Sequence, residues 1–224
     1  MKLYYDPIST TSRPVLLLIQ DAHLPVDLVE ISLFAEDHRT PAFTALNPNQ
    51  AVPALALDGG QVITEVSAIL KYLAEQARHS VYPADLKARA RVNALMDWFN
   101  TGFYRDFGYG LVYPQCIPDY AHTNATTQAD ILRRGAERSA RWLGILNDHY
   151  LAEGPWLCGE AVTIADYLGG GYVSLGDWIG FDLSPWPNVS RWMSALKATS
   201  GWTATHGPFD SFLAMLAEQR RQSA

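Results

Sequence analysis

The apolar residues of the first eighty positions follow two spacings, one typical of strands and one typical of helices. Four short runs of β-favouring residues are predicted as strands, at residues 2–5, 26–31, 52–57 and 61–64. The last two flank Asp58-Gly59-Gly60, a strong hairpin turn sequence, so we expect them to pair antiparallel.

Helices are predicted between these strands. Residues 9–12 all carry hydroxyls of the kind that cap helices, and the Arg13-Pro14 pair after them suits a first helical turn. The apolar helix that begins here runs to about His23. A short helix is predicted from Pro41, and a longer one follows Glu65, where apolar residues recur at helical spacing. The resulting order, β-α-β-α-β-β-α, predicts a mixed four-stranded sheet with helices on its faces.

After Asp85 the pattern indicates helices alone. Prolines separate the helical stretches, and Pro208 precedes the last of them. The stretches are predicted at residues 86–112, 126–150, 163–178, 188–199 and 209–221. We therefore predict a mixed α/β domain at residues 1–77, a linker at residues 78–84 and an all-helical domain at residues 85–224.

Composition narrows the class of protein. The 224 residues suffice for two small domains, and a net charge of −6 gives nucleic-acid binding no global electrostatic support. The two cysteines, Cys116 and Cys158, form no disulfide framework, which favours a reducing compartment. Asp6 and Pro7 stand where a signal peptide would place its apolar stretch, and the apolar run Val15–Ile19 is far too short to span a bilayer. We expect a cytoplasmic protein that binds neither nucleic acid nor membrane.

Motifs for bound cofactors are missing from the sequence. There is no His-Glu-x-x-His, no Gly-x-Ser-x-Gly and no paired Cys/His ligand spacing, and the six histidines are scattered. Gly169-Gly170-Gly171 is not followed by the Lys-Ser or Lys-Thr of a phosphate-binding loop, so we expect these glycines to serve a close helix approach or a bend. The sequence implies no metal, haem, flavin or nicotinamide.

Four segments carry a family resemblance. They are Tyr4–Arg13, Asn47–Leu55, Thr64–Leu73 and Thr163–Asp166. In order and spacing they resemble the cytosolic glutathione S-transferases, and the likeness covers nearly the whole chain. A serine four residues before an arginine is similar to the theta and delta classes, so the chain resembles a bacterial member of this serine type.

The resemblance implies a fold and an activity. The α/β domain would be thioredoxin-like and bind glutathione as cosubstrate, with no further cofactor. The helical bundle would offer an apolar pocket for a second substrate. The implied activity is conjugation of the glutathione thiolate to a small, apolar electrophile, as in detoxification. The implied assembly is a homodimer.

Ser9 is the residue that the resemblance places at the catalytic position. The thiolate is the nucleophile, and a free thiol has a pKa of about 8.5. Lowering that pKa by about two units requires about 2.7 kcal/mol of preference for the anion. One hydrogen bond to a charged group contributes about 1.5–3 kcal/mol and a helix N-terminus about 0.3–1 kcal/mol, so a hydroxyl just before a helix suffices.

Other hydroxyls beside Ser9 leave alternatives open. Thr10 is the second catalytic candidate, because the beta class has its catalytic cysteine at the matching position. A serine before a helix is also a common N-cap with no catalytic role. We expect Thr11 or Ser12 to cap the helix.

The resemblance also implies a set of contacts to glutathione. Val52 would bind the cysteinyl backbone through its own N–H and C=O, as an added strand would, beside a cis-proline. His38 and Gln50 would bind the glycine carboxylate. Glu65 and the helix start that follows it would bind the γ-glutamyl group. The full set of candidates, with Ser9, is His38, Gln50, Val52, Pro53, Glu65, Val66 and Ser67.

The sequence departs from the family pattern at two of these positions. Val66 stands where the family has serine or threonine, so the side-chain hydroxyl is absent while the backbone N–H of the helix start remains. Ser67 lies one residue further on. Gln50 stands where delta-like enzymes carry a histidine.

Aromatic residues crowd the first long helix of the predicted helical domain. An aromatic stripe at helical spacing is more often core than pocket. The candidates for the second-substrate pocket lie late in this stretch, and they are Tyr104, Phe107, Tyr109 and Tyr113. Thr163 and Asp166 form a capping box, which is structural.

Two other functions use the same features. Glutathione-dependent peroxide reduction needs the same activated thiolate. A non-catalytic glutathione-binding or interaction scaffold shares the fold, and fold alone does not determine function. A glutaredoxin-like reductase is disfavoured because no cysteine lies in the first loop.

Overall fold

The computed structural model describes residues 1–222 and divides into two compact units. Unit 1 contains Met1–Tyr82 together with the described residues from Ala198 to Gln222. Unit 2 contains Pro83–Lys197. None of the helices described is both long and apolar enough to cross a bilayer.

A four-stranded mixed sheet forms the centre of unit 1. Its strands are β1 (Lys2–Tyr5), β2 (Asp27–Glu30), β3 (Ala54–Ala56) and β4 (Val62–Thr64), in the order β2-β1-β3-β4. The β1 and β2 strands are parallel, and the other two pairs are antiparallel. The predicted mixed sheet is confirmed. The third strand is shorter than predicted because Val52 and Pro53 precede it, and proline has no N–H for a strand ladder.

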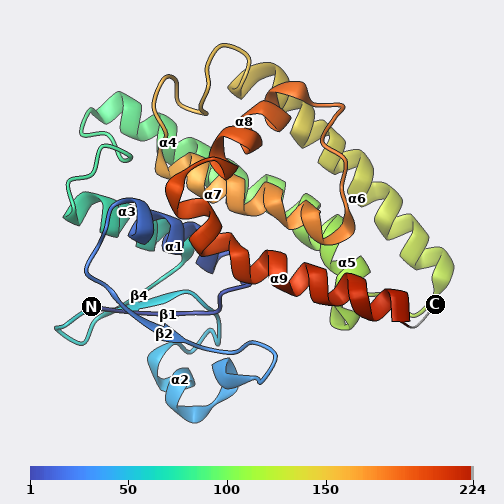
Figure 1. Ribbon diagram of the computed structural model, residues 1–224, viewed down its shortest axis with the longest axis horizontal. Coiled ribbons are helices and arrows are strands. Elements are labelled where there is room, and N and C mark those ends of the chain that lie inside the picture. Colours follow the sequence, from blue (N-terminus) through green and yellow to red (C-terminus); the bar gives the residue numbers. More distant parts are fainter. Residues whose placement is uncertain (223–224) are drawn as a thin grey trace. The chain divides into compact units, whose positions relative to one another are not determined.

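Helices cover both faces of this sheet. They are α1 (Ser12–Asp21), the short 3₁₀ turn η1 (Asp37–Arg39), α2 (Pro41–Leu46), α3 (Val66–Gln76) and α9 (Ser200–Gln222). Figure 1 shows α1 and α3 on one side of the sheet and α2 on the other. The α1 helix contacts both α3 and α9, and its residues from Ser12 to Ile19 are buried.

The C-terminal helix differs from its prediction in length and in partner. We expected Pro208 to precede a helix at residues 209–221, but α9 begins at Ser200 and continues through Pro208. It packs on α1: the Arg13 guanidinium lies 4.0 Å from the centroid of the Phe209 ring, and the Gly201 N–H donates to Asp21 Oδ1 at 3.1 Å. This helix therefore belongs to unit 1, whereas we expected all of residues 85–224 in one helical domain. Periodicity marks a helix but carries no information about its tertiary partner.

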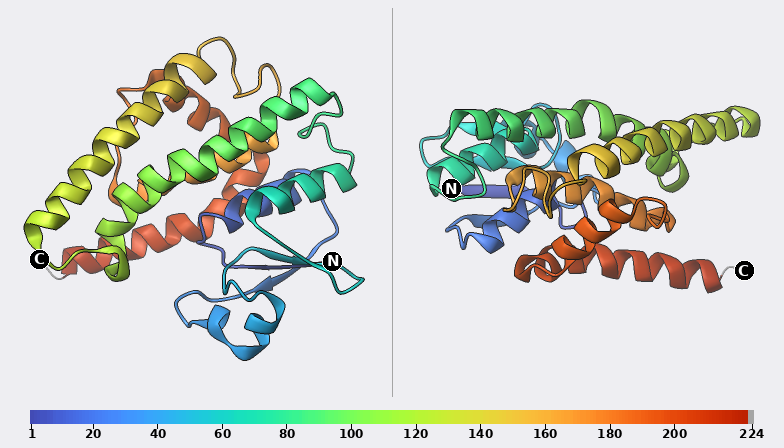
Figure 2. Two further views of the ribbon diagram at one scale, coloured as in Figure 1. Left: turned by 180° about the vertical axis from the view of Figure 1, so that it is seen from behind. Right: turned by 90° about the horizontal axis from the view of Figure 1, so that it is seen from above.

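Unit 2 consists of helices, as predicted. They are α4 (Leu86–Trp98), η2 (Phe99–Phe103), η3 (Arg105–Val112), α5 (Tyr113–Cys116), η4 (Pro118–Tyr120), α6 (Ala125–Ile145), η5 (Leu146–Tyr150), α7 (Ile164–Val173), η6 (Ser174–Ile179) and α8 (Pro187–Lys197). The segments η2, η3 and η5 are π-helical, and η4 and η6 are 3₁₀ turns. Figure 2 shows α6 beside the long helical stretch that begins with α4.

The α7 helix is the buried centre of unit 2. All of its residues are buried, and the predicted capping box of Thr163 and Asp166 is present at its start. The buried Asp166 carboxylate also accepts hydrogen bonds from the Leu157 N–H and the Trp192 Nε1, each at 2.9 Å. A Cβ at Gly169 would overlap the Phe99 ring, so the expected close helix approach is present at this glycine.

Candidate functional site

One end of the sheet in unit 1 gathers the segments predicted to bind the ligand. In the strand register, Tyr4 pairs with Ala54, and Ala54 pairs with Thr64. The loop after β1, the Val52-Pro53 pair before β3 and the start of α3 after β4 therefore lie at the same end. The parallel strand β2 also ends there, and His38 lies in the loop that follows it.

Asp6 holds two of these loops together. Its side chain is buried, with Oδ1 accepting the Ile8 N–H at 2.8 Å and Oδ2 accepting the Leu33 N–H at 2.9 Å. The carboxylate thus joins the loop after β1 to the loop after β2. We did not single out this residue from the sequence, although an aspartate that bonds a backbone N–H two residues on is a common turn signal.

The Ser9 hydroxyl lies at the N-terminus of α1. Its Oγ accepts the Ser12 N–H at 3.3 Å and lies 3.1 Å from Thr11 Oγ1. The Thr11 hydroxyl donates its proton to the Val52 carbonyl at 2.9 Å. Because a hydroxyl has one proton, Ser9 must be the donor to Thr11. The three groups form a directed chain in which Ser9 donates to Thr11 and Thr11 donates to Val52.

The other hydroxyls of the loop have different partners. Thr11, one of the two residues predicted to cap α1, occupies its N-cap position, but its side chain makes no capping hydrogen bond. Ser12 Oγ instead accepts the Asp6 N–H at 3.5 Å, and it is the Ser9 hydroxyl that accepts a free N–H of the first turn. The Thr10 side chain is buried, with 6% of its surface exposed, whereas Ser9 is half-buried.

The segment before β3 has the geometry that the resemblance implies for its proline. The Val52–Pro53 peptide bond is cis, and both residues are buried. The buried Asn47 holds the preceding loop: its Nδ2 donates to the Ala51 carbonyl at 2.7 Å. Gln50 is exposed, and its Nε2 donates to Thr44 Oγ1 at 3.0 Å.

The start of α3 combines backbone strain with free donors. Glu65 has φ of 69°, a region that non-glycine residues adopt at a cost and that is often found at functional sites. It is exposed and stands just before the first helical N–H groups, those of Val66 and Ser67. Groups at this position have no intrahelical acceptor and attract anions. The Val66 side chain is buried and Ser67 is half-buried.

His38 has an unsatisfied ring nitrogen. Its Nδ1 is buried and has no hydrogen-bond partner among the residues that the structure describes. Buried polar atoms are usually paired, so such an atom calls for an explanation.

In unit 2, three of the predicted pocket residues form one cluster. The hydroxyls of Tyr104 and Tyr113 lie 2.6 Å apart, and the Tyr109 ring lies 5.1 Å from each of theirs. Tyr109 is 45% exposed. Tyr172, which we did not single out, stacks on Tyr104 at 4.2 Å. Phe107, in contrast, is fully buried in the core.

The local environment raises the pKa of two of these phenols. Burial, followed by the neighbouring Tyr113 and Tyr109, raises the pKa of Tyr104 well above its usual value. Burial likewise raises the pKa of Tyr109. Tyr104 and Tyr109 therefore present aromatic faces and neutral hydroxyls at neutral pH.

Among the residues that the structure describes, no group of three or more His, Cys, Asp or Glu side chains could hold a metal ion. Burial raises the pKa of the Cys158 thiol, which disfavours its thiolate.

The chain is similar in sequence and in structure to known glutathione S-transferases. Residues 3–80 match the family model described as "Glutathione S-transferase, N-terminal domain". The chain is 30% identical over 170 residues to "Glutathione S-transferase theta-1" of Mus musculus, with 75% of this chain and 70% of that protein covered. Among solved structures, it is similar to a Nilaparvata lugens delta-class glutathione transferase, with a TM-score of 0.82, 30% identity, and 97% and 98% of the two chains covered. It is also similar to human glutathione transferase theta-2 in complex with glutathione and an unknown ligand, with a TM-score of 0.85, 26% identity, and 97% and 90% covered.

Proposed function

The chain belongs to the glutathione S-transferase family, and from this premise we propose that Ser9 stabilises the glutathione thiolate for transfer to a small, apolar electrophile. The observation that carries the proposal is the directed hydrogen-bond chain at the N-terminus of α1. It leaves Ser9 with a donor proton whose present acceptor, Thr11 Oγ1, is neutral.

The chain of hydroxyls makes Ser9 a suitable donor to sulfur. A thiolate is charged, so it is a stronger acceptor than the Thr11 oxygen and would take the Ser9 proton in a hydrogen bond. The Ser12 N–H already donates to Ser9 Oγ, which polarises the hydroxyl toward donation. Ser9 gives a hydrogen bond and never becomes a nucleophile. The half-buried position of Ser9, against the buried Thr10, favours Ser9 as the donor.

Backbone groups at the same end of the sheet would bind the rest of glutathione. The Val52 N–H and C=O would pair with the cysteinyl backbone, and the carbonyl has a second lone pair beside the one that Thr11 uses. The N–H groups of Val66 and Ser67 would bind the γ-glutamyl carboxylate, with Glu65 near the γ-glutamyl amine. The backbone donor of Val66 thus replaces the hydroxyl that its side chain lacks.

The glycine carboxylate would lie toward His38 and Gln50. The buried, unpartnered Nδ1 of His38 supports this assignment, since a carboxylate would satisfy it when that nitrogen is protonated. Gln50 would contribute through its exposed amide, which now donates to Thr44.

The tyrosine cluster of unit 2 is the surface that we propose for the second substrate. Tyr104, Tyr109 and Tyr113 present aromatic area with neutral hydroxyls, which suits an apolar molecule that carries a polar substituent. Phe107 packs instead against Phe103 and Phe181 and would act only as support.

The thiol pKa of bound glutathione tests the proposal. Thiolate absorbance is followed across pH in the wild type, in Ser9→Ala and in Thr10→Val, a neighbouring hydroxyl control. We expect the wild type to lower the thiol pKa about two units below its free value of about 8.5. Ser9→Ala should return the pKa toward 8.5, and Thr10→Val should leave it low.

Other results would assign the hydrogen bond to the thiolate to another residue, or would exclude thiolate activation. A low pKa that survives Ser9→Ala and is lost in Thr10→Val would move the donor to Thr10. Glutathione binding with no pKa shift in the wild type would favour a non-catalytic scaffold. The homodimer and the cytoplasmic location remain predictions.

A further inference from the structure

Three arginines of unit 2 line one cavity of about 420 Å³. Arg105 comes from η3, and Arg138 and Arg141 come from α6, which packs against η3. Asp106 and Trp142 complete the lining. We call this cavity the arginine pocket. Its volume lies within the range of small-molecule sites, about 300–1,000 Å³.

The charges of the arginine pocket are unbalanced. Asp106 is the one acid among its lining residues, so three positive charges against one negative leave an excess of two. The chain as a whole carries −6, so attraction of anions here is a local property.

The Asp106 carboxylate is already fully engaged. Oδ2 accepts the Trp142 Nε1 at 2.7 Å, and the Arg105 guanidinium donates to both carboxylate oxygens at 3.2 Å. Arg138 Nη1 lies 3.6 Å from Oδ1. Burial acts to raise the pKa of Asp106, but these hydrogen bonds and the charges of Arg105 and Arg138 outweigh it and lower the pKa. The carboxylate therefore anchors Arg105 and Arg138, and their other donors can bind a ligand.

The remaining donors face solvent on a rigid base. The side chains of Arg105 and Arg138 are each 65% exposed, and a guanidinium has five N–H donors. Trp142 is held edge-to-face against Trp98 at 5.0 Å, and its ring occupies the space beside Gly102. The Arg141 guanidinium lies 5.9 Å from the Trp142 ring. A base that is already ordered reduces the entropy cost of binding.

We propose that the arginine pocket binds a small dianionic ligand, either a phosphate monoester or a dicarboxylate. Two negative charges match the local excess, and the planar fork of arginine matches both phosphate and carboxylate oxygens. None of the pocket residues belongs to the set proposed for glutathione or for the electrophile. The proposed ligand is therefore distinct from glutathione and from the electrophile.

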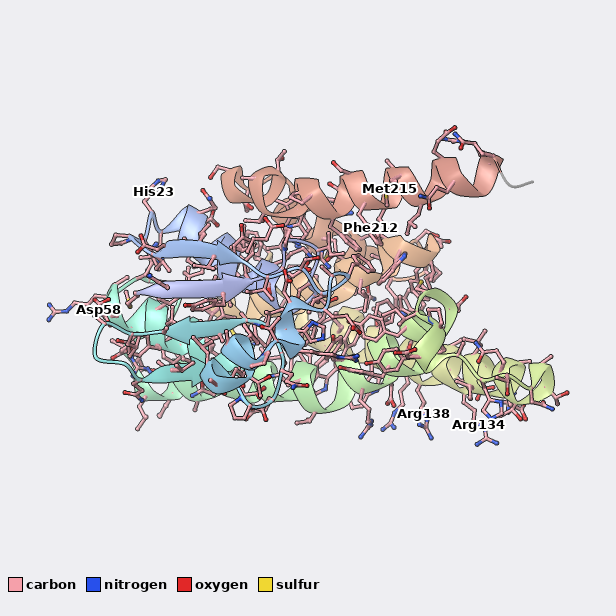
Figure 3. The ribbon with its side chains drawn as sticks, turned by 90° about the horizontal axis from the view of Figure 1, so that it is seen from below. His23, Asp58, Arg134, Arg138, Phe212 and Met215 are labelled. Carbon is pink, nitrogen blue, oxygen red and sulfur yellow. The ribbon has the colours of Figure 1, made fainter. Side chains whose placement is uncertain are left out.

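Isothermal titration of the whole protein at constant ionic strength tests the proposal. Inorganic phosphate and succinate are the two probes. Arg138→Gln and Arg141→Gln each remove a charge from the pocket. Arg134→Gln removes the same charge from α6, one helical turn from Arg138, outside the lining residues. Figure 3 shows Arg134 and Arg138 projecting to the same side.

We expect saturable binding to the wild type of at least one probe. Each pocket substitution should weaken it about tenfold, the effect of one charged hydrogen bond, while Arg134→Gln changes it less than twofold. Preference for phosphate would identify a phosphate monoester, and preference for succinate a dicarboxylate; both support a dianion site. No saturable binding of either probe would overturn the proposal.

Two controls separate the remaining possibilities. Equal weakening by Arg134→Gln would show diffuse attraction to α6 and would also overturn the proposal. Thermal unfolding identifies any variant that fails to fold. Among the residues that the structure describes, Arg141 forms no ion pair with Asp106, so Arg141→Gln keeps the test open if Arg138→Gln unfolds. Ser9→Ala should bind the probe as the wild type does, so failure of the glutathione proposal would not affect this result.

Discussion

Thr11 joins two segments that lie about forty residues apart in the chain. Its hydroxyl donates to the Val52 carbonyl at 2.9 Å, and its oxygen accepts the Ser9 proton at 3.1 Å. One side chain therefore orients the proposed hydrogen-bond donor to the thiolate and also holds the carbonyl of the cis Val52–Pro53 peptide. A residue that looked like a simple cap in the sequence has a tertiary role.

Replacement of Thr11 tests this role. Thr11→Val keeps the shape of the side chain but leaves the Val52 carbonyl without its hydroxyl donor, so we expect the free energy of unfolding to fall by about 1–3 kcal/mol. Chemical denaturation measures this change. Thr11→Ser keeps the hydroxyl and should lose less than half as much. Equal losses in the two variants would show that the methyl group, and not the hydrogen bond, matters.

The contact between α6 and η3 depends on a glycine. A Cβ at Gly135 would overlap the carbonyl group of Gly110, so the two backbones touch where they cross. Glycine costs about 1 kcal/mol relative to alanine inside a helix, and here that cost permits the close approach. The same helix pair carries the arginine pocket. The close crossing brings Arg105 of η3 beside Arg138 of α6.

Two alanine substitutions on α6 separate packing from helix propensity. Gly135→Ala should destabilise the protein by about 1–3 kcal/mol, because the added methyl forces the backbones apart. Gly144→Ala is the matched control, since nothing lies within 4 Å of its Cβ position. It should leave stability unchanged or raise it by up to about 1 kcal/mol. Thermal unfolding of both variants gives the comparison, and a neutral Gly135→Ala would contradict the close contact.

At the scale of the whole molecule, the two ends of the chain build one unit. The α9 helix packs on α1, and the fully buried Arg13 stacks its guanidinium on the Phe209 ring at 4.0 Å. A cation over an aromatic face contributes more when it is desolvated. Unit 1 therefore depends on residues almost two hundred positions beyond its first helix.

Truncation of Phe209 should weaken unit 1 selectively. Phe209→Ala leaves a cavity and exposes Arg13 to an unfilled space, so we expect a loss of about 3–5 kcal/mol. Hydrogen exchange should show reduced protection in α1 and α9 and little change in α6. Phe212→Ala on the same helix, where the side chain is half-buried, should cost less. Equal loss of protection in both units would show that they unfold together.

Much of the fold could be predicted because its signals are local. The hairpin turn at Asp58-Gly59-Gly60, the strand runs and the helical spacing after Glu65 each depend on neighbouring residues. The order of the motifs also led to the family, and with it to Ser9 and to the proline before β3. Local signals failed at Pro208, because packing of α9 on α1 stabilises a helix that continues through the proline.

The sequence by itself therefore determined most of the elements and their order, and the family resemblance supplied the candidate site residues, which remain predictions. Only the tertiary structure decided which hydroxyl donates to which, because Thr11 and Val52 meet through the pairing of β1 with β3. It also decided the partner of α9 and the assembly of the arginine pocket. Arg105 and Arg138 lie more than thirty residues apart, and no local pattern encodes the helix crossing that brings them to one carboxylate.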